Sequence, residues 1–102
     1  MDQDKIRTEE VEAMLRTFAA LDNPDDIFAL LMDMCTIREI SEMSQRLEVA
    51  RLLADKVPYT EIQKRTGVST TTISRVSKCL NYGAGGYARA VALNADTVGE
   101  GE

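Results

Sequence analysis

The chain of 102 residues has no histidine and no tryptophan, and only 5% of its residues are aromatic. Histidine is the side chain most often used for acid–base catalysis and metal binding near neutral pH, so its absence removes the commonest basis for both. The chain also lacks a glycine-rich phosphate loop and a cluster with metal-ligand spacing. We therefore predict no catalytic residue, no metal and no cofactor, and an enzyme is the least favoured class.

Long apolar runs are missing as well. The longest is only a few residues, far short of the roughly 20 that cross a membrane, and the N-terminal MDQDKIRTEE is too charged for a secretory signal. We expect no membrane partner and a cytoplasmic location. The two cysteines, Cys35 and Cys79, have neither metal nor redox spacing, so we expect buried free thiols.

The remaining composition is rich in helix formers and shows no strand-like alternation. A chain of this length has room for a single core, so we predict an all-α protein with one helical domain over residues 1–93. A disordered acidic tail is expected over residues 94–102. The expected helices cover about residues 4–21, 24–35, 37–57, 60–66, 69–80 and 87–93.

Several of these helix ends have clear local signals. Asn23 is a good N-cap, and Pro24 after it suits the first helical position. Thr36 and Glu39 have the spacing of a capping box that opens the long central helix. Pro58 has no amide donor and disfavours helical geometry before it, so it should stop that helix.

The second predicted helix is apolar on nearly every side, so a small monomer could hardly cover it. This pattern predicts a homodimer. The apolar residues are Ile27, Phe28, Leu30, Leu31, Met32, Met34 and Cys35.

Residues 59–80, YTEIQKRTGVSTTTISRVSKCL, read as two short helices joined by a tight turn, a helix-turn-helix. Thr60 and Gln63 can form a capping box that opens the first helix. Gly67 can take positive φ without steric cost and so end that helix. Ser69 is then the N-cap of the second helix.

One face of this pair is apolar and the other polar. Ile62 should point into the core and Val68 into the angle between the helices. Ile73 and Val76 should lie on one face of the second helix, with Leu80 a turn further on. Hydroxyls and an arginine on the other face suit the major groove. The candidates for base reading are Thr70, Thr71, Ser74 and Arg75, with Gln63 and Lys64 nearby. The candidates for phosphate contact are Thr60, Ser69, Thr72 and Lys78.

The charge distribution agrees with a nucleic-acid partner, although the net charge is −5. Between Arg46 and Tyr82 the chain has seven basic and three acidic residues, a balance of +4, and everything else sums to −9. A basic module within an acidic frame would dock on DNA in a defined orientation.

These observations predict a dimeric, sequence-specific regulator that binds double-stranded DNA, most simply a repressor. The alternative is a helical protein-interaction module that keeps the helix-turn-helix shape without binding DNA. The acidic net charge and the modest number of basic residues leave this alternative open. Two departures also weaken the match to common helix-turn-helix sequences: Gln63 replaces a frequent alanine, and Thr66 replaces the aliphatic residue that usually precedes the glycine.

The strings TIREISEMSQRLEVARLL and YTEIQKRTGVSTTTISRVSKCLNYGAGGY resemble the tryptophan repressor family, most closely its TrpR-like YerC/YecD branch. The likeness covers residues 11–93. It implies an intertwined two-fold dimer whose N-terminal helices wrap the partner, with two reading heads about 34 Å apart.

The family's tryptophan pocket can be compared residue by residue. Its recognition-helix arginine matches Arg75, but the glycine that leaves room for the indole is Val76 here, and a ligand-binding serine is Cys79. The second pocket arginine falls on Gln45, next to Arg46. The resemblance implies an effector pocket at these five positions, but with two adverse replacements we expect L-tryptophan not to be the effector. Another effector, or none, would fit equally.

Overall fold

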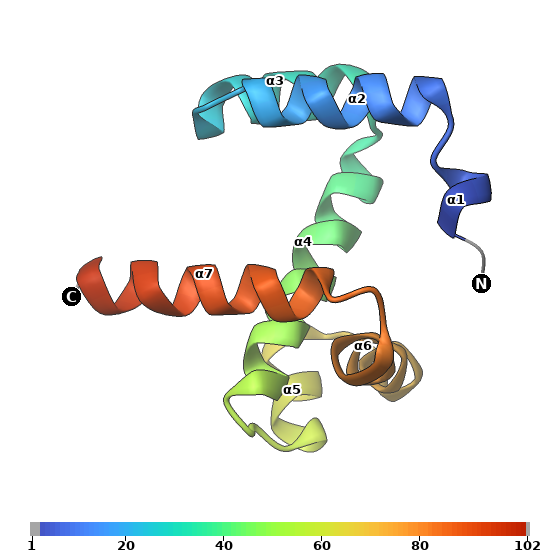
Figure 1. Cartoon of the computed structure of the whole chain (residues 1–102). Coiled ribbons are helices and arrows are strands. Elements are labelled where there is room, and N and C mark those ends of the chain that lie inside the picture. The colour runs from blue at the N-terminus through green and yellow to red at the C-terminus, as the bar shows by residue number, and fades with distance from the viewer. Residues whose placement is uncertain (1–2, 102) are drawn as a thin grey trace. The chain divides into compact units, whose positions relative to one another are not determined.

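The computed structural model describes the backbone of residues 3–101 and the side chains of residues 5–93. Every regular element in this part of the chain is a helix, which confirms the all-α prediction. The chain forms two units, Met1–Ile40 and Ser41–Glu102, and the division falls within α4. The helices, shown in Figure 1, are α1 (Gln3–Ile6), α2 (Glu9–Ala20), α3 (Pro24–Met34), α4 (Ile37–Ala54), α5 (Tyr59–Thr66), α6 (Thr70–Tyr82) and α7 (Gly86–Gly101).

The first predicted helix, over residues 4–21, is in fact interrupted. Thr8 has extended backbone angles, φ −74° and ψ 173°, and its hydroxyl oxygen accepts the amide of Val11 at 3.2 Å. Thr8 is therefore an N-cap, which requires a non-helical residue at that position. The single predicted helix is replaced by the short α1 and the longer α2.

The starts of α3 and α4 follow the predictions. The amide of Asp26 donates to Oδ1 of Asn23 at 2.8 Å, so Asn23 caps α3. At α4 both halves of the capping box are present: Glu39 N donates to Thr36 Oγ1 at 3.0 Å, and Thr36 N donates to Glu39 Oε1 at 2.8 Å. Local hydrogen bonds from side chains therefore determine where α3 and α4 each begin.

The N-terminal unit leaves large apolar side chains uncovered. Neither α2 nor α3 has a buried residue within the described part of the unit. Phe28 is 55% exposed and Met34 52% exposed. This exposure agrees with the apolar surface predicted for the second helix.

The long helix α4 ends at Ala54, before the predicted stop at Pro58. The amide of Lys56 donates to Leu53 O and that of Val57 to Leu52 O, both at 3.0 Å. This pair of bonds is a Schellman motif, with Lys56 in the left-handed region at φ 65°. The backbone therefore closes the helix before the proline is reached.

The helix α5 begins one residue earlier than predicted. Its N-cap is Pro58, which has no side-chain cap bond, and the amides of Glu61 and Ile62 donate to the Pro58 carbonyl at 3.1 and 3.0 Å. The predicted capping box between Thr60 and Gln63 is therefore wrong, since Thr60 already lies within the first turn.

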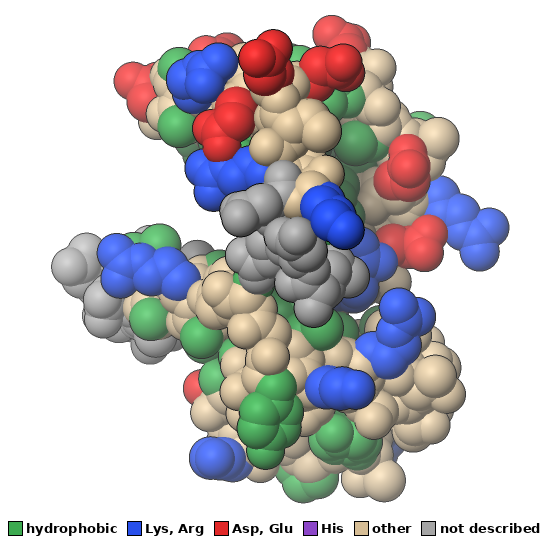
Figure 2. Space-filling view, turned by 45° about the vertical axis from the view of Figure 1, so that its right-hand side comes forward, with side chains coloured by type: hydrophobic (Ala, Val, Ile, Leu, Met, Phe, Trp, Pro, Cys, Tyr) green, Lys and Arg blue, Asp and Glu red, His purple; other side chains and the backbone are tan. Residues whose placement is uncertain are grey.

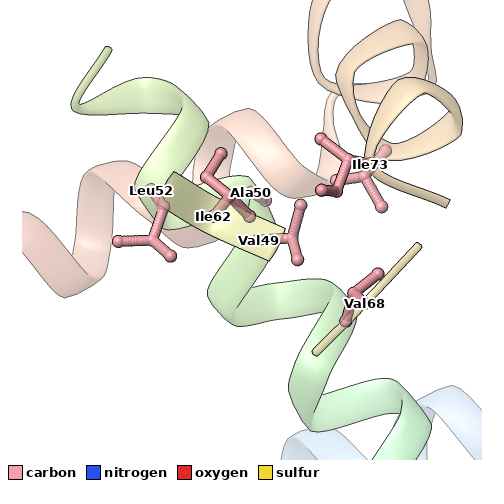
Figure 3. Close-up of a cluster of buried hydrophobic side chains, with 7 residues drawn as sticks. Val49, Ala50, Leu52, Ile62, Val68 and Ile73 are labelled. Atoms are coloured by element: carbon pink, nitrogen blue, oxygen red, sulfur yellow. The ribbon is translucent and has the colours of Figure 1, made fainter. Parts of the chain in front are cut away.

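The core of the C-terminal unit joins α4, α5, the turn and α6. Figure 3 shows its side chains meeting from these elements. Leu53, Val57, Tyr87 and Val91 pack against it. The buried residues are Val49, Ala50, Leu52, Ile62, Val68, Ile73 and Val76. The core therefore contains four of the five apolar residues predicted for the inner faces of the helix-turn-helix, and the fifth, Leu80, is half-buried.

The C-terminal helices are longer than predicted. The backbone of α6 is helical to Tyr82 rather than Leu80, and that of α7 to Gly101 rather than Leu93. No proline interrupts the chain after Pro58, so nothing of that kind stops either helix. The side chains of residues 94–102 lie outside the described residues, and the acidic tail there stays a prediction.

Two further expectations concern single residues and membrane spans. Cys35 is half-buried and Cys79 exposed, so the expectation of two buried thiols is wrong. Cys79 is exposed although it lies only three residues after the buried Val76 on α6, so helical periodicity alone could not predict its exposure. Among the described residues, none of the helices is long and apolar enough to cross a membrane.

Candidate nucleic-acid interface

The turn between α5 and α6 has the predicted geometry. Gly67 is left-handed, with φ 74° and ψ 3°, and its amide donates to Gln63 O at 2.8 Å. A side chain there would meet open space, so the requirement for glycine comes from the backbone alone. Ser69 then caps α6, because its hydroxyl oxygen accepts the amide of Thr72 at 3.2 Å.

The helix α6 has one buried face and one free face. Ile73 and Val76 are buried, and they anchor α6 to the core. Its polar side chains lie elsewhere on the helix. Of the ten residues predicted to contact DNA, Thr72 is half-buried and nine are exposed, namely Thr60, Gln63, Lys64, Ser69, Thr70, Thr71, Ser74, Arg75 and Lys78.

Ion pairs neutralise all three acidic residues counted between Arg46 and Tyr82. Arg51 contacts Glu48 at 2.6 Å and Asp55 at 3.4 Å. Arg65 contacts Glu61 at 2.9 Å. The hydrogen bond from Arg51, together with its charge, holds the pKa of Glu48 below its ordinary value against a smaller opposing effect of burial.

Only two of the seven basic residues in that segment take part in these pairs. The other five have no acidic partner within the described part of the chain, so their charge is available to phosphate. They are Arg46, Lys56, Lys64, Arg75 and Lys78. Most of the acidic side chains visible in Figure 2 gather instead over the N-terminal unit.

The five residues predicted for an effector pocket do lie around one pocket, of about 450 Å³. Gln45 and Arg46 come from α4, and Arg75, Val76 and Cys79 from α6. The pocket lies wholly within the C-terminal unit.

Sequence reasoning missed the other half of the pocket lining. Glu42 could have been found, because it lies one turn before Gln45 and Arg46 on the same helix. Tyr87 could not, because it comes from α7 and reaches the pocket only through tertiary packing. The additional lining residues are Glu42, Val68, Ser69, Thr72 and Tyr87.

Nothing in the described part of the chain resembles a metal centre: no group of three or more His, Cys, Asp or Glu residues is placed to hold an ion.

The fold and the exposed face of α6 define an all-α protein with a helix-turn-helix.

Residues 9–94 match the Trp repressor protein family. The uncharacterized protein YerC of Bacillus subtilis is 42% identical over 91 residues, which cover 89% of this chain and 88% of YerC.

Two solved structures share the fold. A TrpR-like protein from Eubacterium eligens is 40% identical, with a TM-score of 0.85 over 90% of this chain and 95% of that one. A Staphylococcus aureus structure that carries the name of the Trp repressor is 30% identical, with a TM-score of 0.86 over 93% of this chain and 95% of that one. The chain belongs to the Trp repressor family, as the resemblance had indicated. This is a family of DNA-binding regulators and not of enzymes.

Proposed function

We propose that the protein is a sequence-specific transcriptional regulator, acting as a repressor, which binds double-stranded DNA as a homodimer through its helix-turn-helix. The observation that carries the proposal is the division of α6 into an anchored face and a free face. A helix held by Ile73 and Val76 can present its hydroxyls and Arg75 to a major groove without disturbing the core.

The roles of the exposed residues follow from their chemistry. Arg75 can donate two hydrogen bonds to a guanine edge, and short hydroxyl side chains allow α6 to approach the bases closely. Lys78 would contact a phosphate, and Lys64 would lie near the residues that read the bases. Neither lysine has an acidic partner in the described part of the chain. The remaining proposed contacts are Thr60, Gln63, Ser69, Thr70, Thr71, Thr72 and Ser74.

The homodimer is supported by the apolar surface of the N-terminal unit. A monomer would leave Phe28, Met32, Met34 and Ile37 largely in water, at a cost that burial against a second copy would remove. A two-fold pair also gives the two reading heads that a palindromic site needs.

For the pocket we propose an effector other than L-tryptophan, or no effector. Val76 and Cys79 both line it. A valine side chain takes space that an indole ring would need, and a thiol is a weaker hydrogen-bond partner than a hydroxyl.

The proposal is tested by selecting duplexes from a random DNA library with the purified protein and measuring affinity as salt is raised. A DNA-binding regulator should enrich one sequence, and its affinity should fall steeply with salt because counterions are released from the phosphates. An interaction module would enrich no sequence and would not retain sheared chromosomal DNA, and that result would refute the proposal.

A further inference from the structure

The end of α5 is closed by a side-chain hydroxyl as well as by Gly67. The hydroxyl of Thr66, the last residue of α5, donates to the carbonyl of Ile62 at 2.8 Å. The same oxygen accepts the amide of Val68 at 3.2 Å. One side chain therefore contacts the backbone on both sides of the glycine.

These two hydrogen bonds act where the chain has most freedom. Glycine permits the left-handed turn but does not hold it, because it also adopts many other conformations. Val68 is only 9% exposed, and a backbone amide with little access to water needs a partner. Within the described residues, the Thr66 hydroxyl is the one hydrogen-bond acceptor of the Val68 amide.

The apolar contacts of the turn cannot replace this acceptor. Val68 belongs to the same buried cluster as Ile62 and Ile73, but burial of apolar surface is non-directional. A hydrogen bond prefers a narrow range of distance and angle. An aliphatic residue before the glycine would fill the same space and leave the Val68 amide without its acceptor.

We infer that Thr66 is a positioning residue: its hydroxyl fixes the direction in which α6 leaves the turn, and with it the pose in which the free face of α6 meets the bases. This inference rests on the proposed function and adds a residue that does not itself contact DNA. It also accounts for the departure from common helix-turn-helix sequences at this position.

Three substitutions in the full-length protein isolate the hydroxyl. Thr66→Val removes it but keeps a β-branched side chain of similar size, and Thr66→Ser keeps it. Thr17→Val is the matched control, because Thr17 on α2 makes the same bond to a carbonyl four residues earlier, Ala13 O at 2.8 Å. Among the described residues, the Thr17 hydroxyl accepts no amide.

Each protein is titrated into a duplex that the wild type selects and into a duplex of shuffled sequence, and amide hydrogen exchange is followed without DNA. We expect Thr66→Val to bind the selected duplex about tenfold more weakly, equivalent to about 1.4 kcal/mol. Affinity for the shuffled duplex should not change, because non-specific binding depends on charge. Exchange of the Val68 amide should accelerate in Thr66→Val alone, and Thr66→Ser and Thr17→Val should behave as the wild type.

Three outcomes would overturn the inference. Wild-type affinity of Thr66→Val for the selected duplex would show that the hydroxyl does not set the pose. An equal loss of affinity for both duplexes, together with a lower melting temperature, would show that Thr66 has a structural role only. If Thr66→Val folds poorly, Thr66→Ala gives a second measurement. A wild type that binds neither duplex would refute the proposed function itself, and the inference with it.

Discussion

Arg75 and Val76 are neighbours on α6, yet Arg75 is exposed and Val76 is only 3% exposed. Consecutive residues of an α-helix are separated by roughly 100° around the axis, so one can join the core while the next faces away from it. Val76 anchors the helix, and Arg75 keeps a charge that no acidic residue of the described chain neutralises. Loss of Arg75 should therefore affect binding more than folding.

We predict that Arg75→Ala weakens binding to the selected duplex by about 1–3 kcal/mol and changes the free energy of unfolding by less than about 0.5 kcal/mol. Fluorescence anisotropy and urea unfolding measure the two quantities. Arg89→Ala is the matched control, because it removes the same charge from α7, outside the helix-turn-helix, and should have little effect on affinity. Unchanged affinity of Arg75→Ala would contradict its proposed role in base reading.

The pocket residues give a second prediction. L-tryptophan should show no tight binding in isothermal titration, because Val76 takes the space an indole would need. Cys79→Ser restores a hydroxyl in the pocket without removing Val76, so this variant should not bind tryptophan tightly either. A saturable titration with the wild-type protein would show instead that the pocket adapts to the ring.

The dimer can be tested at Phe28, which is 55% exposed on α3. Full burial of a phenylalanine side chain contributes about 1.5–3 kcal/mol. If a second copy covers the 55% of Phe28 that is exposed, each protomer therefore gains roughly half of that, about 0.8–1.7 kcal/mol. Light scattering after size exclusion should show a wild-type dimer and a Phe28→Glu variant shifted towards monomer. Phe28→Leu keeps an apolar side chain and should stay dimeric, while a wild type that remains monomeric at all concentrations would contradict the proposal.

The parts of the fold that the sequence predicted correctly are those with local causes. The capping box between Thr36 and Glu39 needs only residues three apart, and the turn at Gly67 needs only a residue that tolerates positive φ. Helical periodicity alone placed Ile73 and Val76 in the core. Periodicity alone did not predict that residues of α4 and α6 line one pocket. That prediction came from the family resemblance.

The errors have causes that local patterns do not contain. The break at Thr8 and the end of α4 at Ala54 depend on which of several possible caps the folded chain uses. The left-handed residue that ends a helix is usually glycine. At the end of α4 this residue is Lys56, so the sequence contains no signal for the end of the helix there. Tyr87 joins the pocket from α7, and this contact depends on how the helices pack.

Lys56 offers a test of the energy stored at that helix end. A side chain at φ 65° is strained, and glycine there is not. Because glycine also gains freedom in the unfolded chain, we expect Lys56→Gly to raise the free energy of unfolding by only about 0.5–1 kcal/mol. Lys56→Ala removes the same charge but keeps the Cβ atom, so it should give no gain in urea unfolding; an equal gain in both variants would assign the effect to charge.

Glu48 and Arg51 make stability depend on pH in a predictable direction. The hydrogen bond from Arg51 holds the pKa of Glu48 lower in the folded protein than in the unfolded chain. Its contribution is therefore complete above the unfolded-state pKa and is lost as pH falls through the folded-state pKa. Because both side chains are partly exposed, we expect Glu48→Gln to cost only about 0.2–0.5 kcal/mol at neutral pH.

Urea unfolding at neutral pH and again below the folded-state pKa measures this dependence, and a carboxyl NMR titration follows Glu48 directly. The difference between the wild type and Glu48→Gln should disappear at the acidic pH, where both side chains are neutral. In Arg51→Gln the pKa of Glu48 should return towards its ordinary value, because the donor that favours the carboxylate is gone. A stability difference that persists in acid would have to come from packing of the side chain, since an ion pair does not survive protonation of its carboxylate.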